Sequence, residues 1–85
     1  MNKEEFLKRI KEENIRLGEY LIVTEKITDA PLVLGCAYDE GVWIVYRTRE
    51  RGGHFVIKRF VNENDAFDYF YELVLSRYKR YKGIQ

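Results

Sequence analysis

The sequence predicts an α+β fold: a helix, a four-stranded antiparallel meander and a C-terminal helix, with both helices on one sheet face. Three observations predict it. Apolar residues recur every three or four positions near both ends of the chain, β-branched and aromatic residues alternate through the middle, and turn-forming residues separate the alternating runs. Because 85 residues suffice for one hydrophobic core and not for two, residues 1–85 are expected to form a single domain.

The first helix is predicted over residues 3–17, where Phe6, Ile10 and Leu17 fall near one stripe. Gly18 follows as a natural stop, because glycine readily takes the left-handed conformation found after helices. A first strand is predicted over 20–27 from its β-branched, roughly alternating residues. Pro31 ends this segment, since proline cannot donate to a strand ladder.

Two hairpins are predicted next. Strands 33–38 and 42–49 flank the turn at residues 39–41, and the turn at 50–53 leads into a strand over 55–61. Glycines in both turns can take the positive φ that such turns require. Four successive strands with short connections therefore predict a meander.

The last helix is predicted to begin after the capping segment 62–65 and to end near residue 82. Asn62 offers a capping side chain, and Glu63 and Asp65 place negative charge where a helix N-terminus favours it. Phe67 and Phe70 begin an apolar face that continues at spacings of three and four.

The sheet faces follow from an expected pairing of Tyr46 with Ile57 across the turn at 50–53. With that pairing, the helices are expected to cover the face of Val42, Ile44, Tyr46, Phe55, Ile57 and Val61. The opposite face is expected to remain uncovered and to form the binding surface; it carries Trp43, Val45, Arg47, Arg49, His54, Val56, Lys58 and Phe60.

Composition limits the function classes. The chain is 46% hydrophobic and 34% charged, with a net charge of +1, so no global field drives it toward nucleic acid. Its charge is modestly skewed: residues 1–43 hold six basic and nine acidic side chains, and residues 44–85 hold nine and five. No apolar run approaches the ~20 residues that span a bilayer, no signal peptide is recognisable, and only one cysteine occurs. These features predict a cytoplasmic protein that does not enter a membrane.

Catalytic, metal and cofactor sites are not predicted. His54 is the only histidine and has no serine or cysteine at a recognisable motif spacing, so a structural or interfacial role is expected. Cys36 lies between Gly35 and Ala37 in a strand and is expected to be a buried small hydrophobe. One histidine and one cysteine do not make an ordinary four-ligand zinc site, and the Gly52-Gly53 pair lacks a phosphate-loop or dinucleotide pattern. The expectation is a protein that is not an enzyme.

Binding is the remaining class, and two kinds of partner stay open. Arg47, Arg49 and Arg51, with Lys58 and Arg59, crowd one hairpin together with aromatic residues, which suits either a protein or a nucleic acid bound by the basic hairpin 47–59. The order of elements is that of double-stranded RNA-binding domains, but the last helix begins with acidic residues where those domains place basic ones. A homodimer paired through a sheet edge is a third alternative.

A short string of residues carries a family resemblance: Leu34-Gly35-Cys36-Ala37-Tyr38-Asp39, then Trp43, Tyr46, Glu50-Arg51-Gly52, Phe60, Glu63, Ala66, Phe67 and Phe70. With these residues, segment 34–75 resembles small bacterial immunity proteins, which neutralise partner toxins of polymorphic toxin systems. The resemblance implies a cytosolic α+β protein that blocks a cognate toxin by stoichiometric binding. The residues expected at that interface are Trp43, Arg47, Arg49, Glu50, Arg51 and Phe60.

Overall fold

Two helices and one four-stranded mixed sheet make up the fold. The structure is a computed structural model that describes residues 1–83. In chain order the elements are α1 (Lys3–Glu12), β1 (Leu21–Val23), β2 (Val33–Asp39), β3 (Val42–Thr48), β4 (His54–Phe60) and α2 (Glu63–Tyr81). The α+β class is confirmed, and no helix within residues 1–83 combines the length and hydrophobicity needed to cross a bilayer.

The first strand is where the predicted meander is wrong. The sheet order is β1-β2-β3-β4, with antiparallel β2–β3 and β3–β4 pairs, but β1 runs parallel to β2. A parallel neighbour requires a crossover connection, and residues 24–32 supply it. The strand predicted over 20–27 therefore shortens to three residues, and the rest of that segment becomes the crossover.

The helix boundaries have local causes. In α1, the Asn2 side chain accepts from the Glu5 N–H and the Glu5 side chain accepts from the Asn2 N–H, a capping box. The helix ends at Glu12, earlier than predicted, because Asn14 takes a left-handed conformation with φ of 52°. At the other end of the chain, Asn62 caps α2 by accepting from the N–H groups of Asn64 and Asp65, as its position predicted.

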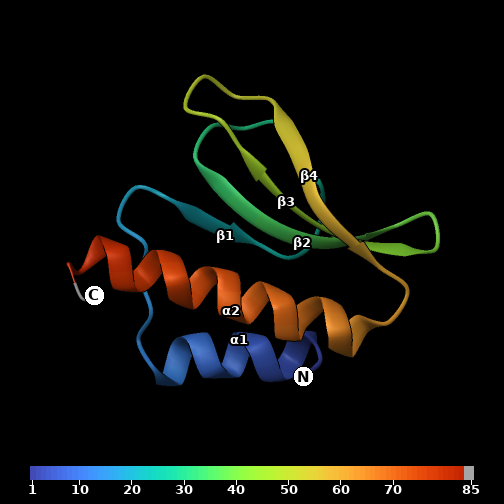
Figure 1. Cartoon of the computed structure of the whole chain (residues 1–85), viewed down its shortest axis with the longest axis horizontal. Coiled ribbons are helices and arrows are strands. Elements are labelled where there is room, and N and C mark those ends of the chain that lie inside the picture. Colours follow the sequence, from blue (N-terminus) through green and yellow to red (C-terminus); the bar gives the residue numbers. More distant parts are fainter. Residues whose placement is uncertain (84–85) are drawn as a thin grey trace.

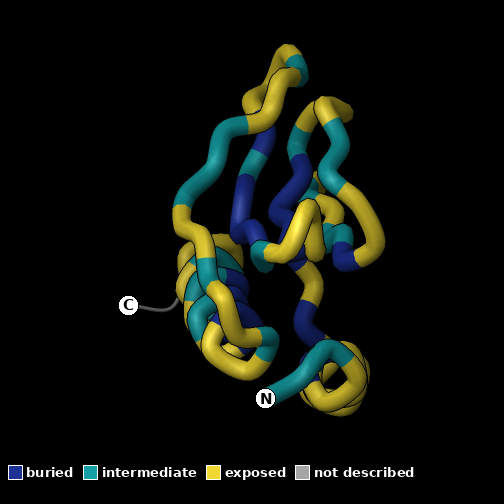
Figure 2. The backbone as a smooth tube through the Cα atoms, turned by 90° about the vertical axis from the view of Figure 1, so that its right-hand side faces the viewer, coloured by how far each residue is buried: buried dark blue, intermediate teal, exposed yellow. Residues whose placement is uncertain are grey.

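The core lies between α2 and the sheet. Helix α2 runs across one side of the sheet and contacts β2, β3 and β4, whereas α1 packs against α2 (Figure 1). Leu34, Cys36 and Val45 from the sheet share a buried cluster with Phe67 and other residues of α2. Helix α1 reaches this cluster through Phe6, whose ring centroid lies 5.5 Å from that of Phe67. Figure 2 shows the buried backbone on the central strands and along the inner sides of the helices.

The predicted choice of covered face is wrong for β3, whereas Ile57 of β4 packs toward α2 as predicted. The side of the sheet that faces α2, called here the helix side, carries Trp43 and Val45, and the Trp43 and Phe67 ring centroids are 5.6 Å apart. Ile44 and Tyr46 instead lie on the far side, in a second cluster with Val33 and with Ile27 of the crossover.

On the far side of the sheet, the Tyr46 ring packs directly over Gly35. A Cβ at Gly35 would lie 2.2 Å from the Tyr46 ring, so only glycine admits the ring at this position. The Tyr46 hydroxyl donates to the Lys26 carbonyl at 2.7 Å and accepts from the Thr28 N–H at 3.3 Å. Segment 26–28 of the crossover is therefore held on this side, where Ile27 packs against the Tyr46 cluster.

Candidate protein-binding surface

The β3–β4 hairpin sets which side chains reach the helix side. Trp43 pairs with Phe60 and Val45 with Lys58, as the predicted register requires. A bulge then shifts the register, so that Tyr46 pairs with Val56 instead of Ile57 and Arg47 pairs with Phe55. Phe55 therefore lies on the helix side beside Arg47, and not on the same side as Tyr46 as predicted.

Beyond the reach of α2, basic side chains rest on aromatic rings. The guanidinium carbons of Arg47 and Arg49 lie 4.8 and 5.3 Å from the centroid of the Phe55 ring. Nearer to α2, the Lys58 ammonium lies 5.4 Å from the ring centroids of both Phe60 and Tyr69. We call these residues the cation–aromatic surface: Arg47, Arg49, Phe55, Lys58, Phe60 and Tyr69.

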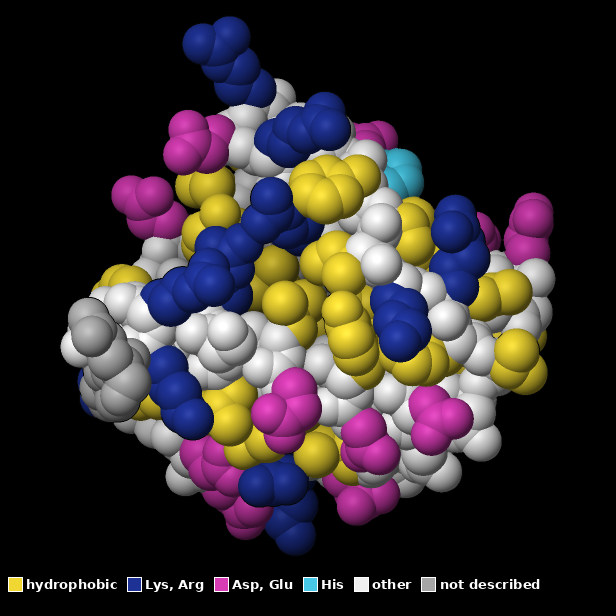
Figure 3. Space-filling model, in the orientation of Figure 1, with side chains coloured by type: hydrophobic (Ala, Val, Ile, Leu, Met, Phe, Trp, Pro, Cys, Tyr) yellow, Lys and Arg dark blue, Asp and Glu magenta, His cyan; other side chains and the backbone are white. Residues whose placement is uncertain are grey.

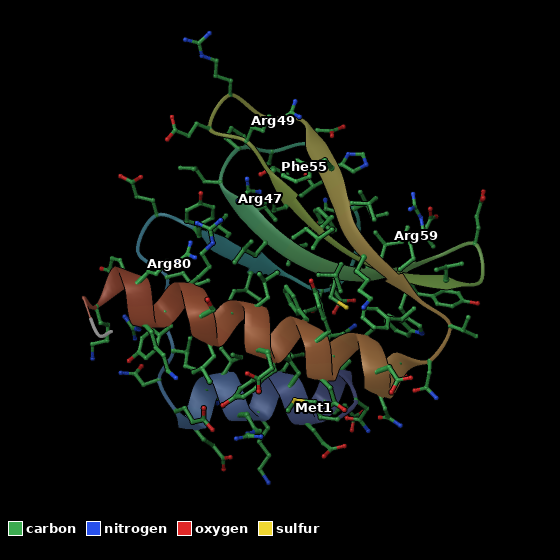
Figure 4. The ribbon with its side chains drawn as sticks, viewed as in Figure 1. Met1, Arg47, Arg49, Phe55, Arg59 and Arg80 are labelled. Atoms are coloured by element: carbon green, nitrogen blue, oxygen red, sulfur yellow. The ribbon has the colours of Figure 1, made fainter. Side chains whose placement is uncertain are left out.

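Figure 3 shows basic and hydrophobic side chains interleaved on this side of the molecule, with most of the visible acidic side chains lower down, over the two helices. Figure 4 places Arg47, Arg49 and Phe55 together on the upper part of the sheet. In the same view, Arg80 rises from the end of α2 toward that region, whereas Arg59 lies on the other side of β4. The basic character of this side therefore comes from both the hairpin and α2.

These cations are held by rings and not by carboxylates. The ion pairs formed within residues 1–83 join the N-terminus to Asp68, Lys3 to Glu25, Arg9 to Glu13 and His54 to Asp29. None of them includes Arg47, Arg49 or Lys58. A cation over an exposed ring gains only ~0.5–1 kcal/mol, and its charge stays available to an anion.

The six residues predicted at an interface do not all lie on this surface. Arg47, Arg49 and Phe60 belong to it, and Glu50 and Arg51 are exposed in the adjoining turn. Trp43 is half-buried between Tyr38 and Phe67. The prediction that Trp43 and Phe60 lie on an uncovered face is wrong, because α2 packs against both: Phe60 is 5.4 Å from Tyr69 between ring centroids.

Lys58 was predicted on the uncovered binding face, whereas Phe55 was expected on the opposite, helix-covered face and Tyr69 was not assigned to a binding face. The pairing of Phe55 follows from the turn before it. The Arg49 N–H donates to the Gly53 carbonyl, and counting two residues away from this bond along each strand places Arg47 opposite Phe55. Tyr69 carried a weaker signal: it lies off the main apolar stripe of the last helix.

Cys36 is a core residue, and His54 links two segments of the chain. Cys36 is fully buried, and burial raises the pKa of its thiol to about 12, which keeps it protonated near neutral pH. The His54 N–H donates to Asp29 Oδ1 at 2.9 Å, and its Nδ1 lies 2.5 Å from the same oxygen. This contact joins the crossover to the start of β4.

Within residues 1–83, no three His, Cys, Asp or Glu side chains come together in a way that could hold a metal ion. Comparison of the chain with models of protein families, with curated protein sequences and with solved structures finds no significant match.

Proposed function

We propose that this protein is a non-catalytic protein-binding module that acts as an immunity protein, neutralising a cognate bacterial toxin in the cytoplasm by stoichiometric binding. The observation that carries the binding part is the cation–aromatic surface, whose cations have no carboxylate partner within residues 1–83. The toxin part rests on the resemblance of segment 34–75 to immunity proteins.

The surface has the properties of a preorganised interface. Arg, Tyr and other aromatic residues are enriched where binding energy concentrates. Ordering a long side chain costs ~0.5–1.5 kcal/mol on association, and part of that cost is already met where the ring of Phe55 holds Arg47 and Arg49. The complementary partner surface presents carboxylates to these cations.

Nucleic acid fits this surface less well. Proteins that bind single strands stack bases on open aromatic faces, but the rings of Phe55, Phe60 and Tyr69 already have cations beside them. Acidic Glu63 and Asp65 begin α2, where they would repel phosphates. The near-neutral net charge of +1 adds no long-range attraction.

The test is protection of cells. The toxin domain encoded beside the gene for this chain would be expressed in a bacterial host, with and without the chain. We expect growth to be restored by wild type and to be lost with the Arg47→Glu/Arg49→Glu double variant. A Lys8→Glu/Lys11→Glu variant, which makes the same charge change on the exposed side of α1, is the control.

Three results count against the proposal: no toxin gene in the neighbourhood, unchanged killing in the presence of the chain, or equal protection by the Arg47→Glu/Arg49→Glu variant. Tight, salt-dependent binding to RNA or DNA in the absence of protection would instead favour a nucleic-acid partner.

A further inference from the structure

Strand β4 lies at one edge of the sheet. The sheet order leaves two edges: β1, of three residues, and β4, of seven. Strand β4 pairs with β3 on one side, and in the part of the chain that the structure describes no strand pairs with its other side (Figure 1), although the N–H of its first residue, His54, donates to Asp29. Such an edge presents backbone N–H and C=O groups that can accept an added strand.

Two consecutive cations stand on this edge. Lys58 pairs with Val45 and Arg59 with Ile44, so the first side chain lies on the helix side and the second on the far side. Both are exposed, and neither forms an ion pair within residues 1–83. A second copy of the strand paired about these residues would bring like charges together, which opposes self-association through the edge.

The same strand contributes to the cation–aromatic surface. Phe55, Lys58 and Phe60 project from β4 to the helix side. A strand added outside β4 would lie at the usual spacing of about 4.8 Å, so its helix-side residues would stand directly beside those three side chains. Backbone pairing and charge pairing would then reinforce each other at one place.

We propose that the protein partner binds by adding an extended segment to the β4 edge, with two consecutive carboxylates facing Lys58 and Arg59 on opposite sides of the sheet. This inference rests on the proposed function, because it specifies how the partner of that same surface is recognised. The occupant is a strand of the partner protein, since the adjacent cations disfavour a second copy of this chain.

The probe is an end-blocked peptide of sequence Thr-Val-Thr-Glu-Glu-Thr-Val-Thr, titrated into the isotopically labelled full chain and followed by amide NMR. Saturable shifts are expected in the amides of residues 54–60. Binding should weaken at least tenfold for a matched Lys-Lys peptide, and likewise for a Glu-Glu peptide whose alternate amides are N-methylated. Absence of binding overturns the proposal, as do equal binding of the N-methylated peptide and shifts that avoid β4.

A charge exchange makes the test sharper. The Lys58→Glu/Arg59→Glu variant should prefer the Lys-Lys peptide by at least tenfold, and the Lys8→Glu/Lys11→Glu variant should keep the wild-type preference. Amide spectra with native dispersion show that each variant folds. An unreversed preference overturns the edge proposal.

The growth assay separates this inference from the function on which it rests. If wild type protects cells and the Lys58→Glu/Arg59→Glu variant protects equally well, the edge is not the docking site and the proposed function stands. If wild type does not protect, the proposed function itself fails.

Discussion

Tyr46 holds the crossover onto the far side of the sheet through its hydroxyl. The ring is fully buried, and the oxygen both donates to the Lys26 carbonyl and accepts from the Thr28 N–H. Burial also raises the pKa of this hydroxyl, so it stays protonated and able to donate. One side chain therefore provides hydrogen-bond partners for two backbone groups of a segment that is not part of a strand.

Tyr46→Phe is expected to lower the free energy of unfolding by about 1–3 kcal/mol, because both backbone groups lose their partner while the packing of the ring is retained. Denaturant unfolding of the variant and wild type measures the change. Tyr38→Phe is the matched control, since Tyr38 is 59% exposed and its hydroxyl forms no hydrogen bond within residues 1–83. Equal stability of the two variants would contradict this role for Tyr46.

Asp29 joins the same crossover to β4 and gives it a pH dependence. The hydrogen bond with the His54 side chain, then that with the His54 N–H, lowers the Asp29 pKa from 3.8 in the folded chain. A carboxyl whose pKa is depressed by folding stabilises the fold above its unfolded pKa, and this stabilisation is lost as the pH falls through the folded pKa.

Asp29→Asn keeps an oxygen acceptor for the His54 N–H and removes the charge. We expect wild type to be the more stable protein at pH 6, and the gap in the free energy of unfolding to close as the pH falls below about 3.8. Glu12→Gln controls for the loss of one exposed negative charge. A gap that stays constant down to pH 2 would show that the Asp29 charge is not involved.

At the scale of elements, α1 depends on α2 for its place in the fold. Phe6 is fully buried, with its ring centroid 5.0 Å from that of Phe70. At the other end of α1, the Tyr71 hydroxyl donates to the Glu13 carboxylate, and Arg9 lies over the Tyr71 ring at 4.4 Å. The Tyr71 hydrogen bond lowers the Glu13 pKa. A ten-residue helix is marginal alone, so these contacts decide whether α1 stays helical.

Phe6→Ala is expected to lower the free energy of unfolding by about 3–5 kcal/mol, the usual range for a buried phenylalanine. Amide hydrogen exchange should accelerate more in residues 3–12 than in β2 and β3, because α1 can detach from α2 while the sheet persists. Leu7→Ala is the control: Leu7 is 42% exposed and should change stability far less. Uniform acceleration across the chain would show that α1 and the sheet unfold as one unit.

Most elements could be predicted from the sequence because their signals are local. The cap at Asn62, the apolar stripe through Phe67 and the glycine turns all act within a few residues. The crossover was missed because Pro31 ends a strand without indicating where the chain goes next. The bulge was missed because an inserted residue in β4 leaves the alternating pattern nearly unchanged while placing Phe55 on the opposite side from Tyr46.

For the whole molecule, the side of the sheet that was expected to be free is instead partly covered by α2. The basic residues on this side therefore lie beside a covered core and not on an open sheet face. Arg47, Arg49 and Lys58 extend past the helix-covered core that holds Trp43. The candidate surface could be predicted only in part, since its cations are visible in sequence but their ring partners depend on pairing between strands.

The charge on this surface predicts how the partner associates. With carboxylates facing Arg47, Arg49 and Lys58, attraction at a distance speeds encounter and is screened by salt. Raising the ionic strength from about 0.05 to 0.5 M should slow association with the proposed toxin partner at least tenfold, while dissociation changes much less. Surface plasmon resonance measures both rates. The Arg47→Ala/Arg49→Ala variant should reduce this salt dependence. The control variant Lys8→Ala/Lys11→Ala should not reduce it, because both lysines lie on α1. An unchanged salt dependence in Arg47→Ala/Arg49→Ala would place the encounter on another face.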